Sequence, residues 1–217
     1  MTDNPRVNQC QKPTGWFGRF TLRNMNSRHA KVTDWGLSHI SIPTQGSILD
    51  IGCGGGRTVS KLAAVATQGK VYGIDHSKES IAVAGKTNRE WIESGRVEIR
   101  EGSVSQLPFS PNIFDLVVAV ETHFWWPDPL ADMREVFRIT KPGGTLIVIA
   151  EVYKGASTTV AKLAEKYAPR TGMKLFTVDE HRDLLANAGY CDVKVIADPG
   201  KGWICATGRK PGGSAAG

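Results

Sequence analysis

Short apolar runs alternate with segments in which apolar residues return every three or four positions. The clearest run ends at Ile51, breaks at Gly52, and is followed by Val59, Leu62 and Ala66 at helical spacing. Continuous apolar runs are typical of strands buried on both faces, and the wider spacing is typical of amphipathic helices. The pattern predicts five strands with helices between them, at residues 48–51, 70–75, 97–101, 114–121 and 145–152.

Capping residues set the expected ends of the helices. Ser77 precedes a helix that is expected to continue to about Glu93, Pro127 and Asp128 begin another, and Thr177 begins one that ends at Gly189. We further expect helical pieces over 15–40, one of them capped by Ser27, a turn at 141–144 and a helix over 157–167.

The last two expected strands, 191–197 and 202–209, are joined by only a few residues. So short a connection requires an antiparallel pair. The whole pattern predicts an α/β fold in which a doubly wound sheet of seven strands, mostly parallel with one antiparallel strand, carries helices on both faces. We expect a loose tail at 1–14, a single domain over 15–209 in which 15–42 form a helical cap over the cleft, and a disordered tail at 210–217.

Composition narrows the class of protein. The chain has 217 residues, 41% of them hydrophobic, and no apolar run approaches the ~20 residues of a membrane helix. The N-terminus lacks the apolar core of a signal peptide, so a cytoplasmic protein with no membrane partner is expected. The four cysteines form no CxxC pair, which predicts reduced thiols and no metal site.

The net charge is +6, and residues 1–40 carry much of it. A basic segment of this kind is either the solvated face of a helix or a contact for an anionic substrate or RNA.

The glycine-rich stretch that follows the first strand indicates a ligand site. It reads D-x-G-x-G-x-G from Asp50 to Gly56, whereas a dinucleotide G-x-G-x-x-G pattern from Gly52 would need its third glycine at Arg57. Asp75 closes the next strand, where a carboxylate can accept both hydroxyls of a ribose. Asp75 alone does not separate a nicotinamide dinucleotide from S-adenosylmethionine.

This stretch resembles motif I of the class I S-adenosylmethionine-dependent methyltransferases, and the likeness extends in order over about residues 46–150. EGSVSQLPF at 101–109 resembles the family's GDA-x-x-LPF segment, with Ser103 where the family usually has Asp, and residues 134–148 resemble its helix, K-P-G-G turn and fifth strand. The resemblance implies a Rossmann-like fold, S-adenosylmethionine as cofactor with S-adenosylhomocysteine as product, and an enzyme of the small-molecule type.

The resemblance also implies roles for individual residues. The expected cofactor-binding residues are Asp50, Gly52, Cys53, Gly54, Asp75, His76, Ser103, Val104, Val120 and Glu121. His123, in the loop after the fourth strand, is the candidate general base or substrate-orienting group because its ordinary pKa lies near neutrality. The candidate substrate-pocket residues are Trp16, Phe17, Met25, His29, Phe124, Trp125 and Tyr153.

The expected reaction is in-line transfer of a methyl group to a small-molecule acceptor, anionic or aromatic, by a monomer or homodimer. Three alternatives stay open: an RNA or tRNA methyltransferase, a nicotinamide-dependent oxidoreductase, and a non-catalytic S-adenosylmethionine-binding protein. Arg57 counts against the oxidoreductase. The absence of an N/D-P-P-Y/F stretch after the fourth strand counts against methylation of a base amine in nucleic acid.

Overall fold

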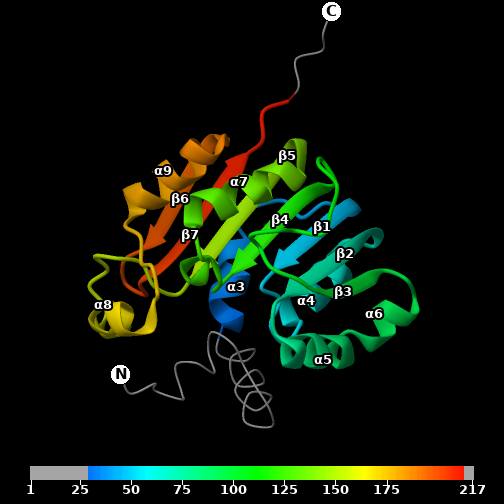
Figure 1. Ribbon diagram of the computed structural model, residues 1–217, viewed down its shortest axis with the longest axis horizontal. Helices are drawn as coiled ribbons and strands as arrows, with labels where there is room; N and C mark the ends of the chain where they lie inside the picture. Colours follow the sequence, from blue (N-terminus) through cyan, green and yellow to red (C-terminus); the bar gives the residue numbers. More distant parts are fainter. Residues whose placement is uncertain (1–28, 213–217) are drawn as a thin grey trace, which may run out of the picture.

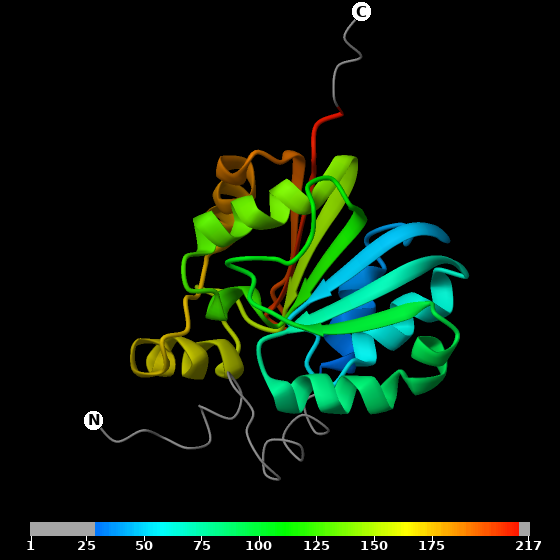
Figure 2. The same ribbon diagram turned by 45° about the vertical axis from the view of Figure 1, so that its right-hand side comes forward.

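The computed structural model describes residues 29–212, and these form one seven-stranded sheet with helices on both faces (Figures 1 and 2). The strand order is β3-β2-β1-β4-β5-β7-β6. Strand β7 runs antiparallel to both of its neighbours and every other pair is parallel, which confirms the predicted fold. The strands are β1 (Gln45–Ile51), β2 (Gln68–Asp75), β3 (Val97–Glu101), β4 (Phe114–Val120), β5 (Thr140–Ala150), β6 (Cys191–Asp198) and β7 (Trp203–Arg209).

The helices divide into two layers because successive side chains of a strand point to opposite faces. Leu49 and Ile51 of β1 share a core with helices α7 (Pro129–Ile139) and α9 (Val178–Ala188). Ile48 faces the other way, into a core with α3 (Ala30–Leu37), α4 (Arg57–Val65) and α5 (Lys78–Thr87). The remaining helical elements are α6 (Arg89–Glu93), the short 3₁₀ helix η1 (His123–Trp125) and α8 (Thr159–Thr171). Within residues 29–212, no helix combines the length and the apolar character needed to cross a membrane.

The order of the strands fixes where a ligand site can form. From β1 the chain moves outward through β2 and β3, and it then returns to place β4 on the other side of β1. The crevice beyond the carboxyl ends of β1 and β4 is therefore the topological switch point, where open α/β sheets bind their ligands.

The predicted helix starts at Ser77, Asp128 and Thr177 are confirmed. Ser77 accepts a hydrogen bond from the Ser80 backbone N–H, and Asp128 accepts one from Ala131. Thr177 forms a reciprocal capping box with Glu180. These short-range bonds involve neighbours in sequence, which is why the sequence could identify them.

Several predicted bounds are wrong. The helix after Ser77 stops at Thr87, because the backbone of Asn88 takes a non-helical conformation. The buried side chain of Asn88 donates hydrogen bonds to the carbonyls of Gly56 and Ala84. The expected turn at 141–144 belongs to β5, and α8 continues past the expected end to Thr171.

The expected cap over 15–42 is only partly described. The helix in it begins at Ala30, and it packs on a face of the sheet through Val32 and Leu37. Ser27 and residues 15–28 lie outside the described residues.

Gly56 combines a left-handed backbone conformation with a close approach to the backbone of α5. It precedes α4 with φ +79°, and an added Cβ would lie 2.8 Å from the Ala84 Cα. We expect Gly56→Ala to lower the free energy of unfolding by about 1–3 kcal/mol, since an L-residue is strained there and the neighbouring backbone has no room to move. Urea unfolding measures the change.

Gly85 supplies the control for this prediction. It lies inside α5, and a Cβ added to it would meet nothing within 4 Å. Gly85→Ala should leave stability unchanged or raise it by up to ~1 kcal/mol, because alanine is the better helix former. Equal unfolding midpoints for Gly56→Ala and the wild type would contradict the prediction.

Candidate active site

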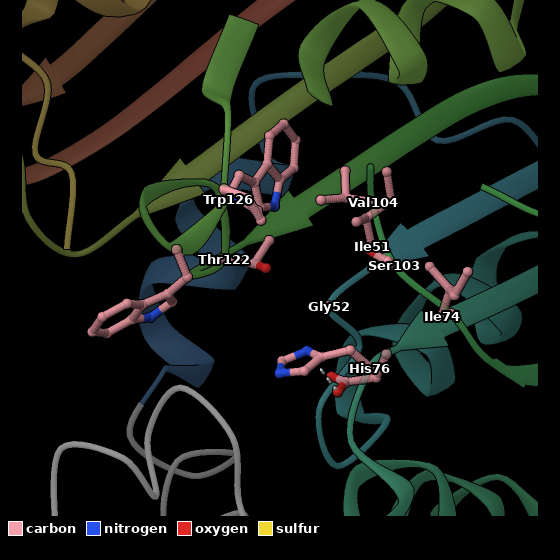
Figure 3. A pocket seen from close by; sticks show the side chains of 12 residues that line it. Ile51, Gly52, Ile74, His76, Ser103, Val104, Thr122 and Trp126 are labelled. Carbon is pink, nitrogen blue, oxygen red and sulfur yellow. Dashed lines mark ion pairs between the residues drawn. The ribbon is translucent and has the colours of Figure 1, made fainter. Parts of the chain in front are cut away.

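A pocket of about 260 Å³ opens at the switch point (Figure 3). The residues that line it come from the ends of β1 and β2 and from the loops that follow β1, β2, β3 and β4: Ile51, Gly52, Ile74, Asp75, His76, Gly102, Ser103, Val104, Thr122, Trp125, Trp126 and Pro127. Figure 3 shows Thr122 and Trp126 on one side and Ile74, His76, Ser103 and Val104 on the other, with Gly52 between them. The topology therefore assembles one site from four separate stretches of chain.

The floor of the pocket is the glycine turn, held in place by the end of β2. The Asp75 carboxylate accepts hydrogen bonds from the backbone N–H groups of Gly54 and Ser77, both at 2.9 Å. The N–H groups of Gly52 and Cys53 both donate to the Ile74 carbonyl, at 2.8 and 3.0 Å. Each Asp75 oxygen keeps a further lone pair, so the carboxylate can still accept bonds from a diol.

The side of the pocket next to β3 is formed by the start of the segment 101–109, which resembles the family's GDA-x-x-LPF stretch. Ser103, Val104 and His76 all line the pocket. The Ser103 hydroxyl accepts a bond from the Ser105 N–H at 3.2 Å, which shapes the loop. The exposed ring of His76 lies with its Nδ1 3.7 Å from Asp75 Oδ1. These residues leave an apolar surface at Val104 and a polar rim at His76 and Ser103.

The opposite side is a wall of three consecutive residues, Trp125, Trp126 and Pro127, with Thr122 at its base. The Thr122 hydroxyl would contact any Cβ added to Gly52, which has φ +70°, so the ends of β4 and β1 approach closely there. The Trp126 side chain is only 3% exposed, and its Nε1–H has no hydrogen-bond partner among the described residues. The wall therefore offers two indole rings and a free donor.

Asp50 and Cys53 lie behind the glycine turn, outside the pocket lining. Burial, and then the charge of Asp75, hold the pKa of Asp50 well above its ordinary value, and Asp50 Oδ2 has no partner in the described structure. Burial, Asp50 and Asp75 also raise the pKa of the Cys53 thiol, which excludes a thiolate nucleophile at neutral pH. Both side chains support the turn from within the core.

His123 lies within η1 and is 2% exposed. Its Nε2 is 2.9 Å from Nε2 of His181, and Nδ1 of His181 is 2.7 Å from the Thr177 carbonyl oxygen. A carbonyl only accepts, so His181 carries its proton on Nδ1 and accepts on Nε2 from the His123 Nε2–H. Burial, reinforced by His181, lowers the pKa of His123, and burial also lowers the pKa of His181, so both rings are neutral.

The assigned tautomers leave Nδ1 of His123 as a bare acceptor, buried and without a partner in the described chain. The ring packs against Phe124, Phe176 and His181 and is absent from the pocket lining. Its position connects the pocket wall to α9.

A second group of ionisable side chains gathers where β4 and β5 end. The ligand atoms of His29, Glu121 and Glu151 lie within 4.8 Å of one another. Glu121, with φ +57°, accepts a hydrogen bond from the Glu151 backbone N–H, and His29 Nε2 is 3.7 Å from Glu151 Oε1. One imidazole and two carboxylates are ligand types that bind divalent cations, and the same charges attract an ammonium group.

The other candidates are placed as follows. Phe124 and Tyr153 belong to a buried cluster with Ala161 and Ile204, and Val120 is the last residue of β4. Trp16, Phe17 and Met25 lie outside residues 29–212. Of the candidate substrate-pocket residues that lie within the described part of the chain, Trp125 is the one that lines this pocket.

Sequence reasoning missed Thr122 and Glu151 as site residues, whereas the aromatic loop residues Phe124, Trp125 and Trp126 suggest a wall from the sequence alone. Thr122 lies in the same loop, and no sequence pattern showed which side chains of the loop would face the pocket. Glu151 carried a usable pattern, since acids follow both β4 and β5, two strands that are neighbours at the same edge of the sheet.

Comparison with known proteins agrees with this geometry. Residues 49–148 match the family model described as a methyltransferase domain. A demethylmenaquinone methyltransferase of Bacillus mycoides is 37% identical over 102 residues, which cover 46% of this chain and 43% of that protein. The chain thus spans about half the length of the curated relatives it matches.

Two solved structures share the fold. One is a chain of the complex between the Haloferax volcanii Trm112 methyltransferase activator and a methyltransferase. Its TM-score is 0.77 at 21% sequence identity, and the match covers 90% of this chain and 96% of that chain. The other is a SAM-dependent methyltransferase of Aquifex aeolicus, with a TM-score of 0.70 at 19% identity over 88% and 96% of the two chains. Residues 49–148 therefore form a methyltransferase domain, and the chain has the fold of the class I S-adenosylmethionine-dependent methyltransferases.

Proposed function

We propose that this protein transfers the methyl group of S-adenosylmethionine to a small-molecule acceptor. The observation that carries the proposal is the Asp75 carboxylate, which is fixed by the N–H of Gly54 in the glycine turn and lines the pocket at the switch point. The family match over residues 49–148 supports the same activity.

Each part of the cofactor has residues suited to it. Asp75 would hold the two ribose hydroxyls by charge-assisted hydrogen bonds. Ser103 and Val104 would border the adenine, with His76 at the outer edge. The methionine part would extend past Gly52 toward Thr122, where Glu121 and Glu151 supply negative charge for its ammonium group.

The chain's own part in the reaction is alignment. The sulfonium of S-adenosylmethionine makes the methyl carbon electrophilic, so the protein has to hold the acceptor in line with it and exclude water. Trp125 and Trp126 wall the side of the pocket where the methyl group would lie, and an indole face also favours a sulfonium through cation–π attraction. Positioning of this kind can lower a barrier by several kcal/mol.

His123 would orient the pocket wall that Trp125 and Trp126 form. Its Nε2 proton is donated to His181 and its ring is buried behind the pocket lining, so it lacks the access that a general base needs. Its short 3₁₀ helix ends at Trp125 and leads directly into Trp126.

The wall of Trp125, Trp126 and Pro127 indicates the chemical class of the methyl acceptor. Two indoles and a proline suit a flat, apolar ring, and the free Nε1–H of Trp126 suits an oxygen substituent on that ring. The Bacillus mycoides relative is named for such a ring, demethylmenaquinone. We propose an oxygenated aromatic acceptor, and a monomer or homodimer as the acting form.

Trp126→Phe tests the role of the indole donor. The exchange removes one hydrogen bond and keeps the aromatic surface, so we expect KM for an oxygenated aromatic acceptor to rise about 5- to 10-fold with cofactor affinity unchanged. Initial rates of S-adenosylhomocysteine formation measure this. A KM within twofold of the wild type would show that Trp126 only packs.

Calorimetry tests the function itself. Titrating S-adenosylhomocysteine, S-adenosylmethionine and NADH separately should show saturable binding of the first two and none of NADH. S-adenosylmethionine should then be converted to S-adenosylhomocysteine in the presence of short-chain naphthoquinols or catechols. Binding of NADH alone would refute the proposal, and cofactor binding without turnover on any acceptor would identify a non-catalytic binding protein.

A further inference from the structure

Helix α8 stands apart from the main layers, beside the carboxyl edge of the sheet where the pocket lies (Figures 1 and 2). Thr158 caps its start and Gly172, in a left-handed conformation, ends it. It attaches through small side chains: Ala161 is fully buried and Ala164 packs on the same cluster, which contains Phe124 and Tyr153. The exposed side chains of α8 lie on the opposite side of the helix from these alanines, at positions 159, 160, 162, 163, 166, 167, 169 and 170.

That outward face carries an apolar stripe. Val160, Leu163 and Tyr167 are 46%, 48% and 45% exposed, at the i, i+3, i+7 spacing that places side chains on one side of a helix. Within residues 29–212, six large apolar side chains are more than about a third exposed, and α8 holds three of them. The other three are single residues on separate elements, as on ordinary protein surfaces.

A row of cations flanks the stripe. Lys162, Lys166 and Arg170 are exposed and follow one another at intervals of four residues. The one acid of the helix, Glu165, is half-buried and accepts a hydrogen bond from the Gly155 N–H at 2.6 Å. The exposed face of α8 therefore joins apolar and positively charged side chains without a negative one, the composition of helices that lie in a membrane interface.

The end of α8 is connected to the pocket wall. The Lys174 N–H donates to the Phe124 carbonyl at 2.8 Å, and Lys174 Nζ is 3.3 Å from the Trp126 carbonyl. A surface that contacts α8 would thus lie next to the segment Phe124–Trp126, which borders the pocket.

We propose that α8 docks this protein onto an anionic lipid surface, with Val160, Leu163 and Tyr167 entering the interface and Lys162, Lys166 and Arg170 contacting the headgroups. The choice of an anionic lipid rests on charge complementarity, because Lys162, Lys166 and Arg170 lie beside the apolar stripe on the same helix. This inference goes beyond the proposed function, and it replaces the expectation of no membrane partner with binding at the surface rather than across it.

Vesicle sedimentation of the full-length protein tests the proposal. We expect binding to vesicles of phosphatidylcholine with phosphatidylglycerol, reduced by salt, and little binding to phosphatidylcholine alone. The double variant Lys162→Gln/Lys166→Gln should bind about 30-fold more weakly, which corresponds to about 1 kcal/mol for each lysine near an anionic surface. Leu163→Ser/Tyr167→Ser should lose binding by a similar factor, because it removes the inserted apolar groups.

Lys86→Gln/Lys194→Gln is the matched control, since it removes the same charge from exposed positions on α5 and β6. It should bind as the wild type does, and circular dichroism and S-adenosylhomocysteine affinity should be unchanged in all three variants. Equal loss in the control, or no binding to anionic vesicles, would overturn the proposal. So would a concentration-dependent dimer that Leu163→Ser/Tyr167→Ser abolishes, because the occupant would then be a second copy of the chain.

Discussion

Replacing Asp75 with alanine is expected to weaken the binding of S-adenosylhomocysteine by about 1–3 kcal/mol, or roughly 5- to 150-fold. The carboxylate is 7% exposed and already holds the N–H groups of Gly54 and Ser77. Its removal deletes the proposed ribose contacts and also releases the glycine turn. Calorimetric titration of the folded variant measures the loss.

Two comparisons separate these effects. Asp75→Asn keeps the shape and loses the charge, so it should fall between alanine and the wild type. Glu101→Gln removes a carboxylate from the position paired with Asp75 on β3, outside the pocket, and should leave the affinity unchanged. An affinity for Asp75→Ala equal to that of the wild type would place the ribose elsewhere and remove the main support for the proposed cofactor site.

The predictable part of the site depended on backbone constraints. Gly52, Gly54 and Gly56 all have positive φ, a conformation that other residues rarely adopt, so the glycine pattern itself specified the turn. Asp75 was predictable because parallel strands end at the same edge, which brings the end of β2 next to the end of β1. The sheet followed from the apolar runs and the short hairpin connection.

The rest depended on contacts between residues far apart in sequence. Asn88 breaks its helix by bonding the Gly56 carbonyl 32 positions away, and His123 turns from the pocket to meet His181 58 positions away. Hydrophobic spacing and capping patterns carry no information on such pairs. The same limit applies to α8, since Ala161 and Ala164 pack on a cluster whose other members, such as Phe124 and Ile204, lie far away in sequence.

His123→Ala is expected to lower the free energy of unfolding by about 3–5 kcal/mol and to slow turnover more than it weakens cofactor binding. The change opens a cavity among Phe124, Phe176 and His181, and it leaves the buried Nε2 of His181 without its donor. Urea unfolding and steady-state kinetics measure the two effects. The exposed His39 supplies the control, since His39→Ala should change stability by less than about 0.5 kcal/mol.

Acid should lower the stability of the native state through the His123–His181 pair. Burial lowers the pKa of His123 and of His181, whereas in the unfolded chain both return to the ordinary histidine value of about 6.5. As the pH falls from 7 the unfolded chain takes up protons first, so stability declines by up to about 1.4 kcal/mol per pH unit for each histidine. His181→Gln keeps an acceptor for the His123 Nε2–H and removes one titrating ring. This variant should therefore retain turnover, while the acid-dependent loss of stability shrinks by about half. An unchanged dependence of stability on pH would show that other groups control this loss. Loss of turnover would show that the imidazole of His181 itself is required.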